Sequence, residues 1–209
     1  MSWLMAAVYD RFMRGSEKAC HERWRAELLR DLAGEVLEIG AGTGSGLRHY
    51  PEAVTRLVLC EPDRHMRRRL RAACEASGRP GVEVSGASLE ALLTSPASLD
   101  AVVSSLVLCS VPDVGAALQQ ILRVLKPGGR LVFLEHVAAE RNPRRLKWQR
   151  RLEPAWKRLA GNCHLARRTE EAILAAGFEM EWILRESIRK AMPLARPSIR
   201  GLARKPECS

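Results

Sequence analysis

The sequence of 209 residues predicts an α/β fold that is doubly wound around a mostly parallel sheet of seven strands. The first observation is that short apolar runs alternate with segments whose apolar residues recur at three- and four-residue spacing. The second is that a glycine-rich turn, residues 40–44, directly follows the first apolar run. In such folds, ligands bind at the carboxyl ends of the strands. We therefore expect a ligand site beside this turn.

The elements follow one another in the alternating order of this fold class. Ahead of the sheet, residues 3–33 are expected to form two helices separated near Gly15. The predicted strands cover residues 36–39, 56–60, 82–84, 99–105, 130–134, 179–185 and 199–203. The helices expected between them cover residues 45–50, 64–76, 114–125 and 169–176. Residues 126–129, Lys-Pro-Gly-Gly, are expected to turn the chain into the fifth strand.

A helical insertion follows the fifth strand. Asn142 can cap a helix that has Pro143 at its first position. Because proline has no amide hydrogen, Pro154 is expected to end that helix and to start a second one. Trp148 and Trp156 are expected to pack these helices onto the core.

The length suits one domain, and we expect four parts within it. These are an N-terminal helical cap over residues 1–33, a cofactor-binding core over 34–139, a helical substrate lid over 140–165, and a C-terminal helix with strands over 166–209.

Composition places the chain among ordinary globular proteins, with 46% hydrophobic residues. The six cysteines are dispersed without a C-x-x-C pair, so the sequence indicates neither a disulfide framework nor a metal site. No signal peptide and no apolar segment of membrane-spanning length are recognisable, which predicts a cytoplasmic location.

The net charge of +10 is uneven, because residues 140–209 contain 17 Lys and Arg but only eight Asp and Glu. The densest part is residues 140–158, and two interpretations of it stay open. One is a solvated helix face; the other is peripheral contact with an anionic membrane, RNA or an acidic substrate. No RNA-binding signature accompanies the charge, and no DNA partner is expected.

The turn itself indicates which ligand it binds. Glycines at 40, 42 and 44 can adopt positive φ and let a small molecule approach the backbone N–H groups. Glu38 lies two residues before the first glycine, where a carboxylate disfavours a phosphate and suits an ammonium group. Glu61 ends the second strand about 20 residues beyond the turn, the place of a ribose-binding carboxylate. A glycine turn alone could be purely structural, but the combination favours a cationic, nucleotide-like cofactor.

Residues 38–44 together with Glu61 resemble the cofactor motif of the class I methyltransferases, a Rossmann-like family that uses S-adenosylmethionine (SAM). Residues 106–111, 135–140, 148–149, 154–156 and 161–165 resemble the thiol S-methyltransferases of the methyltransferase-like group. Residues 9–12 are similar to a helix of the ubiquinone-biosynthesis methyltransferases. The thiol enzymes carry an apolar N-terminal anchor that is not evident here, so the resemblance does not carry over membrane attachment.

The resemblance implies a set of cofactor contacts. Ser104, Ser105 and Leu106 would border the amino acid end of SAM and the path of the methyl group. The loop after the third strand often supplies an acidic residue to adenine, whereas here Ala87 and Ser88 stand there, with Glu90 as the alternative. The full expected set is Tyr9, Glu38, Gly40, Ala41, Gly42, Gly44, Glu61, Pro62, Ala87, Ser88, Ser104, Ser105 and Leu106.

On the acceptor side, His136 is the candidate catalytic residue. It follows the fifth strand, where it can accept a proton, although a structural histidine bonded to a loop carbonyl is the alternative. Cys109 and Cys163 are expected to be small buried hydrophobic residues. The sulfonium of SAM already activates the methyl group, so alignment and exclusion of water are the main tasks of the protein.

The resemblance implies a SAM-dependent enzyme with a small hydrophobic acceptor, and we expect a thiol. Alternatives are N-, O- or C-methylation of a lipid head group, quinone or secondary metabolite. A non-enzymatic alternative is a SAM-fold module that binds RNA or anionic membrane through residues 140–158.

Overall fold

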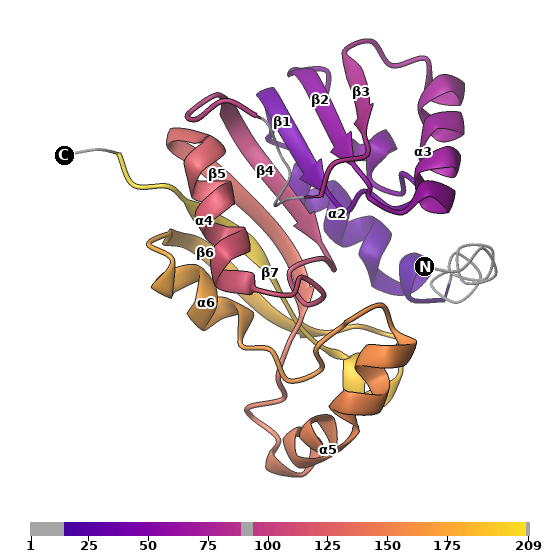
Figure 1. The fold of residues 1–209 in the computed structure, drawn as a ribbon, viewed down its shortest axis with the longest axis vertical. Coiled ribbons are helices and arrows are strands. Elements are labelled where there is room, and N and C mark those ends of the chain that lie inside the picture. Colours follow the sequence, from indigo (N-terminus) through magenta and orange to yellow (C-terminus); the bar gives the residue numbers. More distant parts are fainter. Residues whose placement is uncertain (1–14, 89–93, 208–209) are drawn as a thin grey trace.

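The computed structural model describes residues 15–88 and 94–207. Their strands form one sheet of seven in the order β3-β2-β1-β4-β5-β7-β6 (Figure 1). The strands are β1 (Gly34–Ile39), β2 (Val54–Cys60), β3 (Val82–Ser85), β4 (Leu99–Ser105), β5 (Leu125–His136), β6 (Glu179–Ser187) and β7 (Pro197–Arg204). The first five run parallel, and β7 runs antiparallel to both β5 and β6. The predicted fold class is confirmed.

Helices cover both faces of the sheet. Successive residues of a strand point to opposite faces, so apolar side chains on each face need a covering layer. Val36 belongs to the core beneath α2 (Glu22–Leu29) and α3 (Arg64–Ser77). Its neighbour Leu37 belongs to the opposite core, beneath α4 (Val114–Val124) and α6 (Thr169–Ala175). A π-helical turn, Glu17–His21, leads into α2. The helix expected before residue 15 lies outside the described residues.

Two local predictions were wrong. The helix expected at residues 45–50 is only a 3-10 turn, Leu47–His49. Residues 126–129 lie within β5 rather than in a turn before it. The reason is that this segment pairs with the chain after β7, because the N–H of Gly128 bonds to the carbonyl of Lys205 at 3.0 Å and the carbonyl of Gly129 accepts from Lys205 at 2.8 Å.

The insertion is one helix, α5 (Pro143–Leu159), and the predicted break at Pro154 was wrong. Proline removes the hydrogen bond to the carbonyl four residues earlier, on Arg150. Both residues are exposed, so water can solvate that carbonyl and the helix continues. Trp148 does not pack onto the core as expected, since 53% of it is exposed.

One buried amide holds α5 against the end of the sheet. The side chain of Gln149 is fully buried, and its Oε1 accepts from the N–H of Ala139 at 2.7 Å. Its Nε2 donates to the carbonyls of Val137 at 3.1 Å and Leu194 at 2.8 Å. As a result α5 lies beyond the carboxyl ends of β4 and β5 (Figure 1). Over the described part of the chain, no helix has both the length and the apolar character needed to cross a bilayer.

Candidate active site

The glycine turn leaves β1 with three glycines at positive φ, namely +58° at Gly40, +60° at Gly42 and +88° at Gly44. A Cβ on Gly40 would lie 2.5 Å from Cγ2 of Val107, so glycine allows the loop after β4 to approach the turn. A Cβ on Gly42 would meet no atom within 4 Å. The turn is fixed to β2 by the N–H of Ala41, which bonds to the carbonyl of Cys60 at 2.9 Å. The backbone of the glycine turn is therefore held in place, and the space next to Gly42 is open to a ligand.

Glu61 places its carboxylate on this turn. Its Oε2 accepts from the N–H of Gly42 at 2.9 Å, and its Oε1 accepts from the N–H of Asp63 at 2.8 Å. Only 8% of the residue is exposed, and burial raises the pKa of its carboxyl. A carboxylate offers about four acceptor positions, so two remain for ligand hydroxyls.

Glu38 is buried at the end of β1, behind the turn. Its Oε2 accepts from the hydroxyl of Tyr50 at 2.9 Å. Burial raises the pKa of Glu38 to about 7, against the hydrogen bond from Tyr50, which lowers it. Near neutral pH a cation is therefore needed to hold this carboxyl fully ionised.

The residues expected around adenine follow β2 and β3, whose ends are joined by a bond from the N–H of Glu61 to the carbonyl of Ser85 at 3.0 Å. Pro62 is exposed, and the N–H of Ala87 donates to Oγ of Ser85 at 3.1 Å. Ser88 is half-buried. Tyr9 and Glu90 lie outside the described residues.

The segment at the end of β4, Ser104 to Leu106, has a strained backbone, and one of its two hydroxyl groups is already hydrogen-bonded within the protein. The hydroxyl of Ser104 donates to Oε1 of Glu135 at 2.7 Å, so it faces β5. Oγ of Ser105 is buried without a partner among the described residues. Leu106 has φ of +60°, a conformation that costs energy for a residue other than glycine and is frequent at functional sites.

Glu135 is a site residue that the sequence reasoning did not select. The residue is fully buried, and its carboxylate accepts four hydrogen bonds. The donors are the hydroxyl of Ser104 and the N–H groups of Val107, Leu108 and Cys109. The available signal was an acidic residue directly after the apolar run of β5. Glu135 thus fixes the loop that faces the glycine turn.

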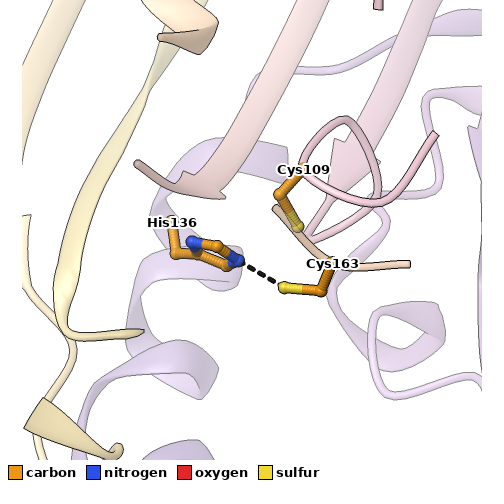
Figure 2. A group of neighbouring side chains, drawn as sticks. All are labelled: Cys109, His136 and Cys163. Carbon is orange, nitrogen blue, oxygen red and sulfur yellow. Dashed lines mark hydrogen bonds between the residues drawn. The ribbon is translucent and has the colours of Figure 1, made fainter. Parts of the chain in front are cut away.

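His136 lies beside two thiols (Figure 2). Its Nε2 and the Sγ of Cys163 are 2.6 Å apart, whereas its Nδ1 has no partner among the described residues. Hydrogen bonding from the Cys109 thiol lowers the pKa of Cys163, and the same contact raises the pKa of Cys109. The two cysteines are buried as expected, but their sulfurs converge on the imidazole.

Comparisons with known proteins agree with this geometry. A family model described as a methyltransferase domain matches residues 37–133. Thiol S-methyltransferase TMT1B of Rattus norvegicus is 34% identical to this chain over 86% of it and 77% of its own length. Human TMT1A is 33% identical over 84% of this chain and 74% of its own.

The chain is a class I SAM-dependent methyltransferase.

A demethylmenaquinone methyltransferase of Thermobifida fusca is also similar to this methyltransferase, at 32% identity over 70% of this chain and 60% of its own. Among solved structures, the [4+2]-cyclase SpnF superposes with a TM-score of 0.73 at 20% identity, covering 90% of this chain and 81% of its own. Geranyl diphosphate methyltransferase in complex with SAM gives 0.69 at 11% identity, covering 90% and 85%. These two likenesses show the fold.

SAM is the cofactor of this methyltransferase, and the described residues fit it. The space over Gly42 is open, Glu61 retains acceptor positions for ribose hydroxyls, and Glu38 is a carboxyl whose ionisation a cation would stabilise. When bound, SAM supplies a methyl group already activated on a sulfonium. The individual cofactor contacts stay predictions.

Proposed function

We propose that this methyltransferase acts on the sulfur of a small hydrophobic thiol. The supporting observation is the length of the similarity to the thiol S-methyltransferases, which extends well beyond the matched methyltransferase domain. The similarity to the quinone enzymes is shorter. Helix α5 and the loops around it lie over the carboxyl ends of β4 and β5, where the acceptor is expected to bind. Sequence similarity to the thiol S-methyltransferases in this region therefore supports a similar acceptor.

The positions of the residues suit such a reaction. The cofactor residues follow β1 and β2, and the strand order places β4 beside β1 and β5 beside β4. A thiol bound at the ends of β4 and β5 must lose its proton and be held in line with the methyl group. The unpartnered Nδ1 of His136 is the candidate proton acceptor. Helix α5, which lies beyond the carboxyl ends of β4 and β5, would exclude water from the acceptor site.

An acceptor screen tests this proposal. Purified protein is incubated with SAM and, in separate reactions, with alkyl thiols, phenols, primary amines and a demethylated quinone, and methylated products are measured by mass spectrometry. We expect thioethers to dominate, and the Glu61→Ala variant serves as the control for cofactor-dependent product. Methylation of the phenol or quinone without thioether would support C- or O-methylation instead. No product from any acceptor would favour a non-enzymatic module.

We also propose that α5 rests on an anionic membrane surface. Trp148, Leu152 and Leu159 are exposed by 53%, 41% and 73%, and their four- and seven-residue spacing places them on one stripe of the helix. Arginines flank the stripe, and the guanidinium of Arg151 lies 5.6 Å from the ring centre of Trp148. An apolar stripe bordered by positive charge is complementary to an interface of acyl chains and anionic head groups. Hydrophobic acceptors concentrate in that interface.

A further inference from the structure

Two thiols and one imidazole converge at a point that the cofactor residues do not use. Cys109 lies in the loop after β4, His136 ends β5, and Cys163 lies in the loop after α5. Their sulfur atoms and the ring nitrogen all lie within 4.8 Å of one another (Figure 2). The exposed fractions are 2%, 5% and 9%. The folded chain therefore brings three buried side chains together, each of which can act as a soft or borderline metal ligand.

Backbone contacts hold the three donors in place. The N–H of Cys109 bonds to Oε2 of Glu135 at 3.2 Å, and the carbonyl of Cys109 accepts from the N–H of His164 at 2.8 Å. The second bond joins the loop of Cys109 to the loop of Cys163. His136 is fixed by strand pairing opposite Ser198 of β7. The positions of the three metal-ligating side chains are therefore fixed by backbone contacts of the fold, and not only by contacts among the side chains themselves.

The donor set matches the chemistry of zinc. Zinc takes Cys sulfur at about 2.3 Å and His nitrogen at about 2.0–2.1 Å in tetrahedral sites, which places donor atoms roughly 3.5 Å apart. The three atoms lie within 4.8 Å of one another, and Nε2 of His136 and Sγ of Cys163, now 2.6 Å apart, would separate by about 1 Å to reach that arrangement. Two thiolates would balance the charge of a divalent cation, which removes the cost of burying either thiolate alone. The carboxylate of Glu135 is committed to four hydrogen bonds and does not compete as a ligand.

We propose that Cys109, His136 and Cys163 bind one zinc ion with an open fourth position. Three protein ligands are typical of zinc sites that keep a position for water or substrate. The hydroxyl of Ser110, 3.5 Å from Sγ of Cys109, is a further polar group near the site. Zinc on Nε2 would leave the proton on Nδ1 of His136, so this proposal replaces the proton-acceptor role of that residue. It does not depend on which acceptor is methylated.

Cobalt substitution tests the site without using activity. Protein is reduced, freed of metal with a chelator, and titrated with Co²⁺ in the absence of SAM and acceptor. We expect one equivalent to give thiolate-to-cobalt charge-transfer absorption and the visible bands of tetrahedral Co²⁺, both abolished by Zn²⁺. Cys109→Ser, Cys163→Ser and His136→Gln should each weaken binding at least tenfold. Cys74→Ser and His164→Gln are matched controls, since Cys74 is a half-buried thiol on α3 and His164 adjoins Cys163.

Thermal melting provides a second measurement that needs no variant, because a ligand that binds only the folded chain raises the melting temperature. Zn²⁺ should raise it in the reduced wild-type protein. The proposal is overturned if reduced protein shows neither charge-transfer absorption nor this shift. It is also overturned if the two control variants lose binding as much as the cluster variants, or if the cysteines are found only as a Cys109–Cys163 disulfide that binds no metal after reduction. None of these outcomes affects the methyltransferase assignment.

Discussion

The backbone N–H of Gly42 donates a hydrogen bond of 2.9 Å to the carboxylate of Glu61, 19 residues away in the sequence. This contact joins the turn after β1 to the end of β2, and it orients a buried carboxylate toward the space over the turn. Removal of the carboxylate by Glu61→Ala should weaken SAM binding about 100-fold, since hydrogen bonds to a charged group contribute roughly 1.5–3 kcal/mol each. Isothermal titration calorimetry measures the affinity.

The control for this variant is Glu52→Ala, which removes an exposed carboxylate before β2. It should bind SAM like the wild type. If Glu61→Ala keeps wild-type affinity while its circular dichroism shows the native fold, the predicted role of Glu61 in ribose binding is wrong.

Gly42→Ala tests whether the open space over the turn is the cofactor site. Gly42 and Gly78 form a matched pair, with φ of +60° and +61° and no atom within 4 Å of a Cβ built on either. Alanine at either position should cost about 1–2 kcal/mol of folding free energy, because L residues are disfavoured at positive φ. Only Gly42→Ala should also lose SAM affinity, by tenfold or more. Equal affinity in the two variants would place the cofactor elsewhere.

The raised pKa of Glu38, about 7, predicts opposite pH trends for binding and stability. Because the ammonium of SAM is predicted to pair with the ionised carboxylate, affinity should fall as pH decreases through about 7. Folding stability should change in the other direction. Because the pKa is higher in the folded than in the unfolded chain, the contribution of Glu38 is largest below its ordinary pKa of 4.5 and is lost as pH rises through about 7.

Glu38→Gln removes the titrating group and should flatten both profiles. SAM affinity from calorimetry and unfolding by urea are measured across the same pH series. Persistence of the same pH dependence of SAM affinity in Glu38→Gln would assign it to another group.

His136→Ala should lower kcat by about 100-fold and leave SAM affinity within twofold of wild type, because the predicted role of His136 is on the acceptor side, either as proton acceptor of the metal-free protein or as a zinc ligand. Steady-state kinetics with the preferred acceptor and calorimetry with SAM separate the two effects. His164→Ala, which alters a neighbouring histidine that pairs with Glu153, is the control. Wild-type turnover in His136→Ala would leave the residue a structural role.

The membrane proposal predicts that a triple variant, Trp148→Ser with Leu152→Ser and Leu159→Ser, loses binding to vesicles that contain phosphatidylserine. Sedimentation with vesicles measures it. Leu174→Ser removes a comparably exposed leucine from α6 and should bind normally. Wild-type binding should weaken with salt and with neutral phosphatidylcholine vesicles. Vesicle binding unchanged in the triple variant, or salt-sensitive binding to RNA alone, would contradict the proposal.

Much of the fold could be predicted from local patterns. All seven strands were identifiable, most of them as apolar runs bounded by turn residues, and helix α3 ends at Gly78 as glycine patterns indicate. The glycine turn and Glu61 were identifiable because their predicted cofactor contacts follow a spacing typical of one βαβ unit. The break at Pro154 was predicted wrongly because solvent exposure, which a local pattern does not contain, decides whether a helix tolerates proline.

The convergence around His136 could not be predicted, because it joins residues 27 positions apart on each side of the β5 end. No short spacing relates Cys109, His136 and Cys163, and only the strand order brings their loops together. The role of Glu135 was hidden for a similar reason. Its partners are mostly backbone N–H groups of another loop, which carry no sequence signature.

Glu135 also sets a limit on how this enzyme could be redesigned. One carboxylate accepts hydrogen bonds from both Ser104, which is predicted to border SAM, and Cys109, so an alteration there would disturb both segments together. Helix α5 is attached through the amide of Gln149 and the carboxylate of Glu153, and much of its surface is exposed. Libraries of variants that aim at new acceptors are therefore best restricted to α5, with Glu135 and the segments bonded to it left unchanged.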